Sequence, residues 1–314
     1  MTGRVLGLDG GGSKTMALVV NRSGDVLAHT NDTGLDPTAG PDWEMRLRAI
    51  AGRIGPVDAA VLGLPYHTEI AAVSARQTQL GTALFGPACS VVNDVAVAFE
   101  GALAGQDGVL ILSGTGSMSW ARGPAGVVRV GGWGDVFGDE GSAYWIGREA
   151  LTLVSRHLDG RQSCADFALS ILHQLGVPPD GLIAWTYGHI NPRVQIAVIA
   201  ETVSKLADRG NPQAGALLHR AANQLAELGR TAARLIGAKS PLIWSFAGGV
   251  TQDQTLCRAL TDTMGCPPVP ARLPPVGGAV LLAAQSAGWS TDDAFIARLA
   301  ANLTAILPPQ TQTA

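Results

Sequence analysis

The feature that most constrains the fold is a short apolar run that ends in an acid and three glycines. Residues 4–8 read RVLGL, Asp9 follows, and a glycine-rich turn at 10–15 leads into a second apolar run at 16–20. After a polar turn, a third run begins at Val26. Strands joined by such short turns pair side by side in opposite directions. The opening of the chain therefore predicts an antiparallel meander with a glycine turn between its first two strands.

The same pattern returns later in the chain. Residues 5–13 align without gaps on residues 109–117, and six of the nine positions are identical. Because both copies lie at a strand-to-strand turn, we interpret them as a duplicated domain rather than a chance match. The 314 residues also exceed the size at which a single core stops growing, about 250–300 residues. We predict two domains, 1–105 and 106–314, with the last helix a candidate to pack back on the first.

Apolar spacing between and after these copies predicts an α/β fold. Apolar residues recur every three or four positions in the predicted helices, and Trp43, Leu47 and Ile50 share one face of the first. Helices are expected at 41–54, 66–82, 95–104, 140–157, 193–209, 212–236, 251–264 and 276–287. Buried strands are expected at 59–64, 88–92, 109–112 and 242–246. The alanine-rich faces of the helices at 193–236 fit either a homodimer contact or the core.

Composition excludes several classes of protein. Apolar residues make up 46% of the chain, which is enough for packed cores. The net charge is -3 and no block of Lys and Arg stands out, so we expect no nucleic-acid partner. No apolar stretch is as long as a membrane span, and the N-terminus does not resemble a signal peptide. We expect a soluble, cytoplasmic protein that has no membrane partner.

The cysteines give no sign of a metal or cluster site. They stand at Cys89, Cys164, Cys257 and Cys266, and no two of them form a CxxC pair. Zinc and iron–sulfur sites use more closely spaced cysteines. We therefore expect free thiols in a reducing compartment.

Three glycine turns follow apolar strands and suggest a phosphate site. They lie at 10–12, 114–116 and 248–249. Glycine lets the backbone approach a ligand closely and direct several N–H groups at phosphate oxygens. A P-loop or a dinucleotide fingerprint would open a helix, whereas a strand follows the first turn here. Ordinary tight turns are the alternative, but three of them after strands favour phosphate binding.

Two acids stand where phosphoryl transfer would need them. Asp9 ends the first strand, where a carboxylate could hold Mg²⁺ for the phosphates; the alternative is a turn-forming Asp. Asp94 follows the strand at 88–92 and Asn93, at the start of a helix. It could accept the proton of an attacking hydroxyl, or it could simply cap the helix.

A longer glycine-rich stretch carries a resemblance to a known family. Residues 131–147 read GGWGDVFGDEGSAYWIG and resemble the signature of N-acetylglucosamine kinases and the related BadF/BadG/BcrA/BcrD-type ATPases. The order of the glycine turns, Asn93-Asp94 and this stretch also matches the family, from residue 4 to about 280. The resemblance implies the actin/Hsp70/sugar-kinase superfamily. That fold has two ribonuclease H-like (actin/hexokinase-type) α/β domains with an interdomain nucleotide cleft.

The resemblance also implies roles for individual residues. Asp94 matches the family's catalytic base, and Asp9 is expected to hold Mg²⁺. The residues expected to bind ATP are Gly10, Gly11, Gly12, Ser13, Lys14, Thr15, Gly114, Thr115, Gly116, Gly248 and Gly249. Those expected to bind the sugar are Asp36, Asn93, Asp94, Thr115, Gly132, Trp133, Asp139 and Ala143. For Asp139 and Glu140 the alternative is stabilisation of a helix N-terminus, and for Trp133 it is core packing.

One position departs from the family pattern. Related sugar kinases usually carry Asn near Asp36, whereas this chain reads Thr33-Gly34-Leu35-Asp36-Pro37. An ionised carboxylate only accepts hydrogen bonds, while an amide also donates them. At the sugar site, Asp36 could favour a cationic amine such as that of glucosamine. The alternative is an Asx turn before Pro37.

The residues and the family resemblance together leave three functions open. The first is ATP- and Mg²⁺-dependent phosphorylation of a small sugar: N-acetylglucosamine or glucosamine at the 6-hydroxyl, or another hexose derivative such as N-acetylmuramic acid. The second is an ATPase activator subunit of the BadF type, whose relatives use cysteines to hold an iron–sulfur cluster. The third is a sugar-responsive regulator, which would carry a DNA-binding domain before its first strand. We expect the kinase, acting as a homodimer.

Overall fold

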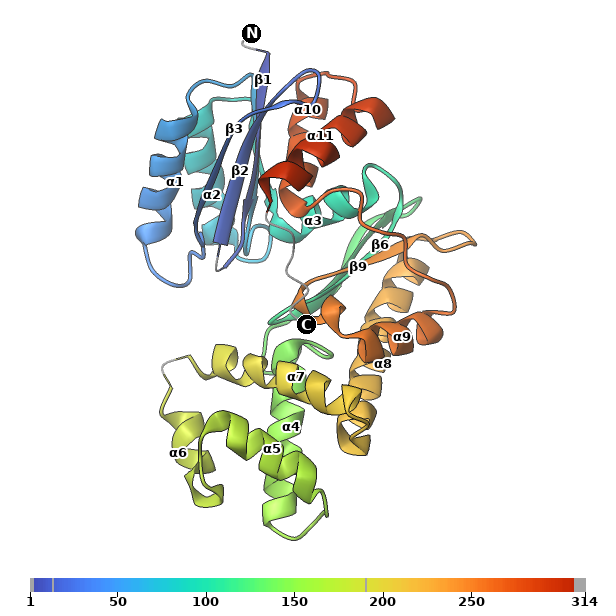
Figure 1. The fold of residues 1–314 in the computed structure, drawn as a ribbon. Coiled ribbons are helices and arrows are strands. Elements are labelled where there is room, and N and C mark those ends of the chain that lie inside the picture. The colour runs from blue at the N-terminus through green and yellow to red at the C-terminus, as the bar shows by residue number, and fades with distance from the viewer. Residues whose placement is uncertain (1–2, 13, 190, 308–314) are drawn as a thin grey trace. The chain divides into compact units, whose positions relative to one another are not determined.

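The chain divides into two compact units. A computed structural model describes residues 3–12, 14–189 and 191–307 of the 314-residue chain. The first unit contains the residues up to Gln106 together with those from Pro270 onward, and the second unit is Asp107–Val269. Both units are mixed α/β structures, so the predicted fold class is confirmed. Figure 1 shows the elements of each unit.

The sheet of the first unit begins with the predicted meander. The strands β1 (Arg4–Gly10), β2 (Lys14–Asn21) and β3 (Val26–Thr33) pair antiparallel in sequence order. On its other edge, β1 pairs in parallel with β4 (Ala59–Leu64), which pairs in parallel with β5 (Cys89–Asn93). The strand order is therefore β3-β2-β1-β4-β5. The parallel strands β1, β4 and β5 end at the same edge of the sheet.

Helices cover both faces of this sheet, because its central strands β1 and β4 are buried on both sides. On one face, α1 (Asp42–Ile54) and α2 (Ala71–Phe85) bury side chains against Leu6, Leu8 and Leu62. Trp43, Leu47 and Ile50 of α1 are buried there as predicted. On the other face, α3 (Asp94–Leu103), α10 (Pro275–Ser286) and α11 (Asp293–Ile306) contribute to a second core.

The helices α10 and α11 correct the predicted second domain, which was expected to run to residue 314. Glycines allow α10 to pack directly on the first unit. A Cβ at Gly7 of β1 would lie 2.4 Å from the backbone nitrogen of Val280, and one at Gly278 would lie 2.0 Å from the carbonyl oxygen of Val97. Such distances are possible only between backbones without an intervening side chain. The helix predicted at 276–287, which was the candidate to pack back on the first domain, is α10; it belongs to the first unit together with α11.

The second unit repeats the meander. The strands β6 (Gly108–Ser113), β7 (Ser117–Gly123) and β8 (Gly126–Gly131) pair antiparallel, and β6 pairs in parallel with β9 (Trp244–Ala247). The order β8-β7-β6-β9 is the same as β3-β2-β1-β4 in the first unit. The two matching segments thus form the same hairpin in each unit. This topology supports the interpretation of a duplicated domain.

Helices dominate the rest of the second unit. Its core contains the long helix α8 (Pro212–Leu235), which packs on β6, β7 and β8, and α9 (Gln254–Met264), which packs on α8. The helix α4 (Ala143–Leu158) packs along α7 (Pro192–Asp208) and also contacts α5 (Ala165–Leu175). A short helix α6 (Leu182–Tyr187) follows the 3-10 turn Pro179–Gly181, and a second 3-10 turn, Gly249–Gln252, follows β9.

Two groups of helices differ from the sequence-based expectation. The helix expected at 66–82 begins only at Ala71, because residues 65–70 form a turn in which Tyr66 (φ 62°) and Thr68 (φ 71°) are left-handed. The helices α5, α6 and α11 were not predicted. Within the described residues, no helix has the length and apolar character needed to cross a membrane.

Candidate functional site

The acids of the first unit gather where its parallel strands end. Asp9 lies at the end of β1, opposite Gly63 of β4, and Leu64 of β4 is opposite Asn93 of β5. The next residue, Asp94, is the first of α3. In open α/β sheets, ligands bind at this carboxyl edge, because loops and helix N-termini converge there. The structure therefore brings Asp9 and Asp94 to one edge, as a phosphoryl-transfer site requires.

Asn93 is a structural support for Asp94. Its side chain is only 3% exposed, and its carbonyl oxygen accepts a hydrogen bond from the backbone N–H of Val95, which caps α3. Its amide nitrogen donates to the carbonyl oxygen of His67 (3.0 Å) and to Glu69 (3.1 Å). Both ends of the amide are thus engaged within the protein. Direct contact of Asn93 with a sugar stays a prediction.

The two carboxyl groups at this edge bind protons more tightly than usual. Burial raises the pKa of Asp94 to about 6, against the effect of the Val95 N–H, and the charge of Glu69 raises it further. Burial also raises the pKa of Asp9 to about 7; the charge of Asp94 adds to this and that of Lys14 opposes it. Such perturbed carboxyl groups at a strand edge are typical of sites for proton transfer or metal binding.

The turn that holds Glu69 is fixed by buried polar contacts. His67 and Gln77 are buried, and the ring Nδ1 of His67 lies 3.0 Å from the amide oxygen of Gln77. The Gln77 amide nitrogen donates to the carbonyl oxygen of Pro65. These contacts hold the left-handed residues Tyr66 and Thr68, a conformation that costs free energy in residues other than glycine. The turn can therefore present Glu69 to Asn93 in one geometry.

The first glycine turn closes with a hydrogen bond from the N–H of Gly11 to the carbonyl oxygen of Lys14. A Cβ at Gly12 would meet no atom within 4 Å, so this backbone borders open space. The side chain of Lys14 is exposed, whereas Thr15 is buried and its hydroxyl donates to the carbonyl oxygen of Thr33. Ser13 lies outside the described residues. The open backbone fits a phosphate better than the Thr15 hydroxyl does.

Asp36 follows this turn closely in space, because the N–H of Leu35 donates to the carbonyl oxygen of Gly11. One oxygen of Asp36 accepts from both the N–H and the hydroxyl of Thr38, at 2.7 Å each. This geometry is an Asx turn, the alternative that the sequence left open. The second carboxylate oxygen is not used by these two bonds. A role for Asp36 in sugar binding stays a prediction.

In the second unit, the other two glycine turns touch each other. The parallel strands β6 and β9 end side by side, and a Cβ at Gly248 (φ 108°) would lie 2.1 Å from the carbonyl oxygen of Ser113. No atom lies within 4 Å of the position that a Cβ would take at Gly114 or at Gly249. The two turns therefore form one patch of exposed backbone. This patch could receive part of a nucleotide without displacing any side chain.

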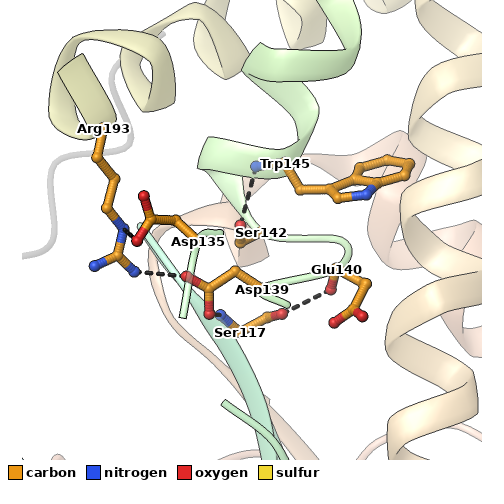
Figure 2. Close-up of polar contacts among 7 residues, drawn as sticks. All are labelled: Ser117, Asp135, Asp139, Glu140, Ser142, Trp145 and Arg193. Atoms are coloured by element: carbon orange, nitrogen blue, oxygen red, sulfur yellow. Dashed lines mark hydrogen bonds and ion pairs between the residues drawn. The ribbon is translucent and has the colours of Figure 1, made fainter. Parts of the chain in front are cut away.

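Asp139 lies against the second glycine turn, and Figure 2 shows its contacts. It is 3% exposed and left-handed, with φ 57°. One carboxylate oxygen accepts from the N–H of Ser117 (3.2 Å), and the other accepts from Arg193 (2.6 Å). Burial raises the pKa of Asp139, while Ser117 and Arg193 oppose that rise. Arg193 also faces Asp135 at 3.8 Å.

The remaining predicted sugar residues frame Asp139. The N–H of Ala143 donates to the carbonyl oxygen of Gly114, and the N–H of Gly132 donates to that of Ser117, so both are tied to the second glycine turn. Thr115 is exposed within that turn. Trp133 is 66% exposed, which excludes the alternative of core packing for this ring. Its indole face is covered on one side by the guanidinium of Arg129, at 5.2 Å.

Comparison with protein families decides the relationship. The model of the BadF/BadG/BcrA/BcrD ATPase family matches residues 6–283 of the chain. The chain belongs to this family. The matched segment contains both hairpins, Asp94, the Asp139 turn and the Gly248 turn, so each site described above lies within the family region.

Two curated family relatives are sugar kinases by name. The N-acetyl-D-glucosamine kinase of Dictyostelium discoideum is 27% identical over 318 aligned positions, covering 90% of this chain and 98% of that protein. The N-acetylmuramic acid/N-acetylglucosamine kinase of Clostridium acetobutylicum is 25% identical over 260 positions, covering 78% of this chain and 85% of that protein. Both similarities extend over most of each chain.

Solved structures agree with the family assignment. A provisionally named N-acetylglucosamine kinase from Chromobacterium violaceum superposes with a TM-score of 0.72 and 28% identity, over 89% of this chain and 98% of that one. A ROK family glucokinase from Streptomyces griseus superposes with a TM-score of 0.57 and 19% identity, over 90% of this chain and 99% of that one. The second likeness concerns the fold alone, and it agrees with the predicted fold class.

The family's cofactors can be tested against these residues. No three His, Cys, Asp or Glu side chains among the described residues are grouped so that they could hold a metal by themselves. Mg²⁺ is usually held by one or two carboxylates together with waters and substrate phosphates. A single acid such as Asp9, beside an open glycine turn, therefore fits a phosphate-bound Mg²⁺. The open backbone at Gly12, Gly114 and Gly249 fits phosphate groups in the same way.

Two site residues were missed by the sequence analysis. Glu69 was placed inside a predicted helix, and nothing in its neighbourhood indicated that it would reach Asn93. Arg193 was placed at the start of a predicted helix, 54 positions from the Asp139 that it binds. No local pattern connects residues so far apart. Only the packing of α7 against α4 brings Arg193 to the site.

Proposed function

We propose that this protein is a kinase that transfers the γ-phosphoryl group of ATP to an amino sugar. The carrying observation is Asp94, a carboxyl group with a pKa of about 6 at the same sheet edge as Asp9 and the first glycine turn. A base needs a pKa close to the working pH, and burial provides this here. Membership of an ATPase family and two relatives named as sugar kinases support the same reaction.

The proposed reaction uses few protein groups. Asp94 accepts the proton of the sugar hydroxyl as the hydroxyl oxygen attacks the γ-phosphorus, the bond to the β,γ-bridging oxygen breaks, and ADP leaves. The N–H groups of the glycine turns would hold phosphate oxygens. Asp9 would hold the Mg²⁺, which neutralises phosphate charge. In this scheme, Asn93 and Glu69 hold Asp94 in place through the start of α3.

The substrate that we favour is N-acetylglucosamine or glucosamine, phosphorylated at the 6-hydroxyl. N-Acetylmuramic acid is a further candidate, since one relative carries both acyl sugars in its name. Asp36 bears on the choice between the first two sugars. If its second carboxylate oxygen meets the amino group, glucosamine gains a charge-assisted hydrogen bond that the N-acetyl sugar lacks.

The test is an ADP-release assay with glucosamine, N-acetylglucosamine, N-acetylmuramic acid, N-acetylmannosamine and glucose. We expect turnover with at least one amino sugar and a product carrying phosphate at the 6-position, identified by NMR. ADP release that does not depend on any sugar, together with bound iron, would instead support the ATPase activator. An Asp36→Asn variant with an unchanged preference between glucosamine and N-acetylglucosamine would remove the role of Asp36.

Three finer expectations accompany this proposal. Turnover should require Mg²⁺, and EDTA should abolish it in a way that added Mg²⁺ restores. The protein should elute as a homodimer in size-exclusion chromatography with light scattering. Fractionated cells should contain it in the cytoplasm.

A further inference from the structure

The ion pair between Arg193 and Asp139 is unusual in its surroundings. The pair joins the first turn of α7 to the turn that precedes α4, and Asp139 is almost fully buried. Removing the partner of a buried carboxylate strongly destabilises the folded protein. This pair therefore differs from an ion pair between two exposed side chains. In Figure 2 the guanidinium reaches from α7 to both Asp139 and Asp135.

The second glycine turn is built against this pair. A Cβ at Gly116 would lie 2.8 Å from the Arg193 Nη2 and 2.8 Å from one oxygen of Asp139. That same oxygen accepts from the N–H of Ser117, the residue after Gly116. The carboxylate is therefore in close contact with the backbone of the turn that also carries Thr115.

The backbone at Asp139 is held in a conformation that costs about 1–2 kcal/mol for residues other than glycine. Glycine would relieve this cost but would remove the carboxylate. Strain of this kind persists where the surroundings over-determine it, which is common at ligand sites. The surroundings here are Ser117 on one oxygen and Arg193 on the other.

Arg193 itself is placed by tight helix packing. A Cβ at Gly147 of α4 would lie 1.9 Å from the carbonyl oxygen of Ile196, so α7 crosses α4 with almost no gap close to Arg193. The guanidinium does not use all of its hydrogen-bond donors. Its Nε is buried without a hydrogen-bond partner and lies 3.8 Å from a carboxylate oxygen of Asp135. One-third of the side chain remains exposed.

We propose that Arg193 is a positioning residue for the sugar site: it fixes Asp139 as an ionised acceptor beside the second glycine turn. This inference rests on the proposed kinase function and on the predicted role of Asp139 in binding the sugar. The charged groups that act on Asp139 are Arg193 of α7 and Asp135 of its own loop, and they act in opposite directions. Glu140 is adjacent and uses its carbonyl oxygen to accept from the Ser117 hydroxyl. Arg193 thus provides the positive charge at this carboxylate.

The test compares Arg193→Gln and Arg193→Lys with wild type. Arg193→Gln should raise the KM for the sugar by up to roughly 100-fold, because a displaced contact group can cost that much, while the Kd for a non-hydrolysable ATP analogue changes less than threefold. Arg193→Lys keeps the charge and should recover part of the loss. The matched control is Arg220→Gln, which breaks a different ion pair of the same unit, with Glu149.

A pH series separates positioning from mere folding. Arg193 lowers the pKa of Asp139, so without it this carboxylate should take up a proton at higher pH, and sugar affinity should begin to fall at a higher pH in Arg193→Gln than in wild type. In an Asp139→Asn background, Arg193→Gln should add little to the sugar KM. Equal losses of sugar and ATP affinity without any pH dependence would overturn the inference. Wild-type protein that turns over no sugar would overturn the proposed function and this inference together.

Discussion

The two hairpins share a topology but differ in charge at their turns. In the first unit, β1 ends in Asp9, and the edge beside it carries Asp94 and Glu69. At the position matching Asp9, the second unit has Ser113, whose buried hydroxyl donates to the carbonyl oxygen of Gly141. The acid that does lie by the second hairpin, Asp139, is balanced by Arg193. One copy of the frame thus gathers acids at its strand edge, and the other offers backbone N–H groups and a carboxylate paired with Arg193.

This difference shows where function resides in a duplicated fold. In both units the hairpin has the same strands and turn, but its first strand ends near an acid, Asp9, in one unit and in a hydroxyl residue, Ser113, in the other. Burial then decides what the acid can do, since it raises the pKa values of Asp9 and Asp94 into the range where protons exchange near neutral pH. We expect the first unit to contribute the base, the metal ligand and the first glycine turn. We expect the second unit to contribute the other two glycine turns and most of the predicted sugar contacts.

The strongest test of this division is Asp94→Asn. Loss of the base should slow kcat on the order of 10²–10⁴-fold, with ATP affinity nearly unchanged. Stability should not fall. The native pKa of Asp94 is raised from 3.8 to about 6, so its contribution to stability is fully present below pH 3.8 and is lost as the pH rises through 6. The variant should therefore be at least as stable as wild type at pH 8. Exposed Asp262, changed to Asn, is the control, and an active Asp94→Asn enzyme would refute the assignment of the base.

The next effect should come from Gly248→Ala in the second unit. The new Cβ would meet the Ser113 carbonyl oxygen at 2.1 Å in a backbone conformation that other residues rarely adopt. We expect a loss of roughly 3 kcal/mol in the free energy of unfolding by urea. Affinity for an ATP analogue should also fall on the order of 10-fold, which corresponds to a loss of about 1.4 kcal/mol in binding free energy.

Gly237→Ala is the matched control for this change. Gly237 is also left-handed (φ 66°), but its Cβ would meet no atom within 4 Å. Its cost should be only the conformational one, about 1–2 kcal/mol, with nucleotide affinity unchanged. If both variants bind the ATP analogue equally well, the Gly248 turn does not contact the nucleotide.

The smallest expected effect is a shift of the acid limb of activity in Glu69→Gln. Activity should need ionised Asp94, so kcat/KM at saturating Mg²⁺ should fall as the pH drops below about 6. Glu69 raises the pKa of Asp94, and Gln keeps the oxygen that accepts from Asn93 while removing the charge. The midpoint should move to lower pH by less than about one unit. A midpoint that moves upward or stays in place would show that Glu69 does not act on Asp94 by its charge.

Much of the frame could be predicted because its signals are local. The apolar runs around Gly10–Gly12 and Gly114–Gly116 predicted both hairpins, and the spacing of Trp43, Leu47 and Ile50 predicted the buried face of α1. Asp94 could be placed at the start of α3 because a predicted strand and Asn93 precede it, but the residue that caps the helix is Asn93, not Asp94 as the sequence had allowed. Each of these inferences needs only residues that are close to one another in the sequence.

The rest depends on contacts between distant residues. The turn at 65–70 was predicted as helix, but Tyr66 and Thr68 are left-handed there, and the contact between His67 and Gln77 that accompanies this turn joins residues ten positions apart. The pairing of Arg193 with Asp139 follows from the crossing of α7 over α4, which the spacing of either helix alone does not encode. Sequence reasoning therefore found the acids but not the groups that set their charge.

The return of α10 to the first unit has a consequence for how the chain acquires its structure during synthesis. The second unit is one unbroken stretch, Asp107–Val269, so a ribosome releases all of it before residues 275–286 appear. Until then, the apolar surface of β1 and β4 against which α10 packs is not covered by that helix. The segment made first is thus completed last, and its uncovered sheet is the part of a nascent chain that would most need a chaperone.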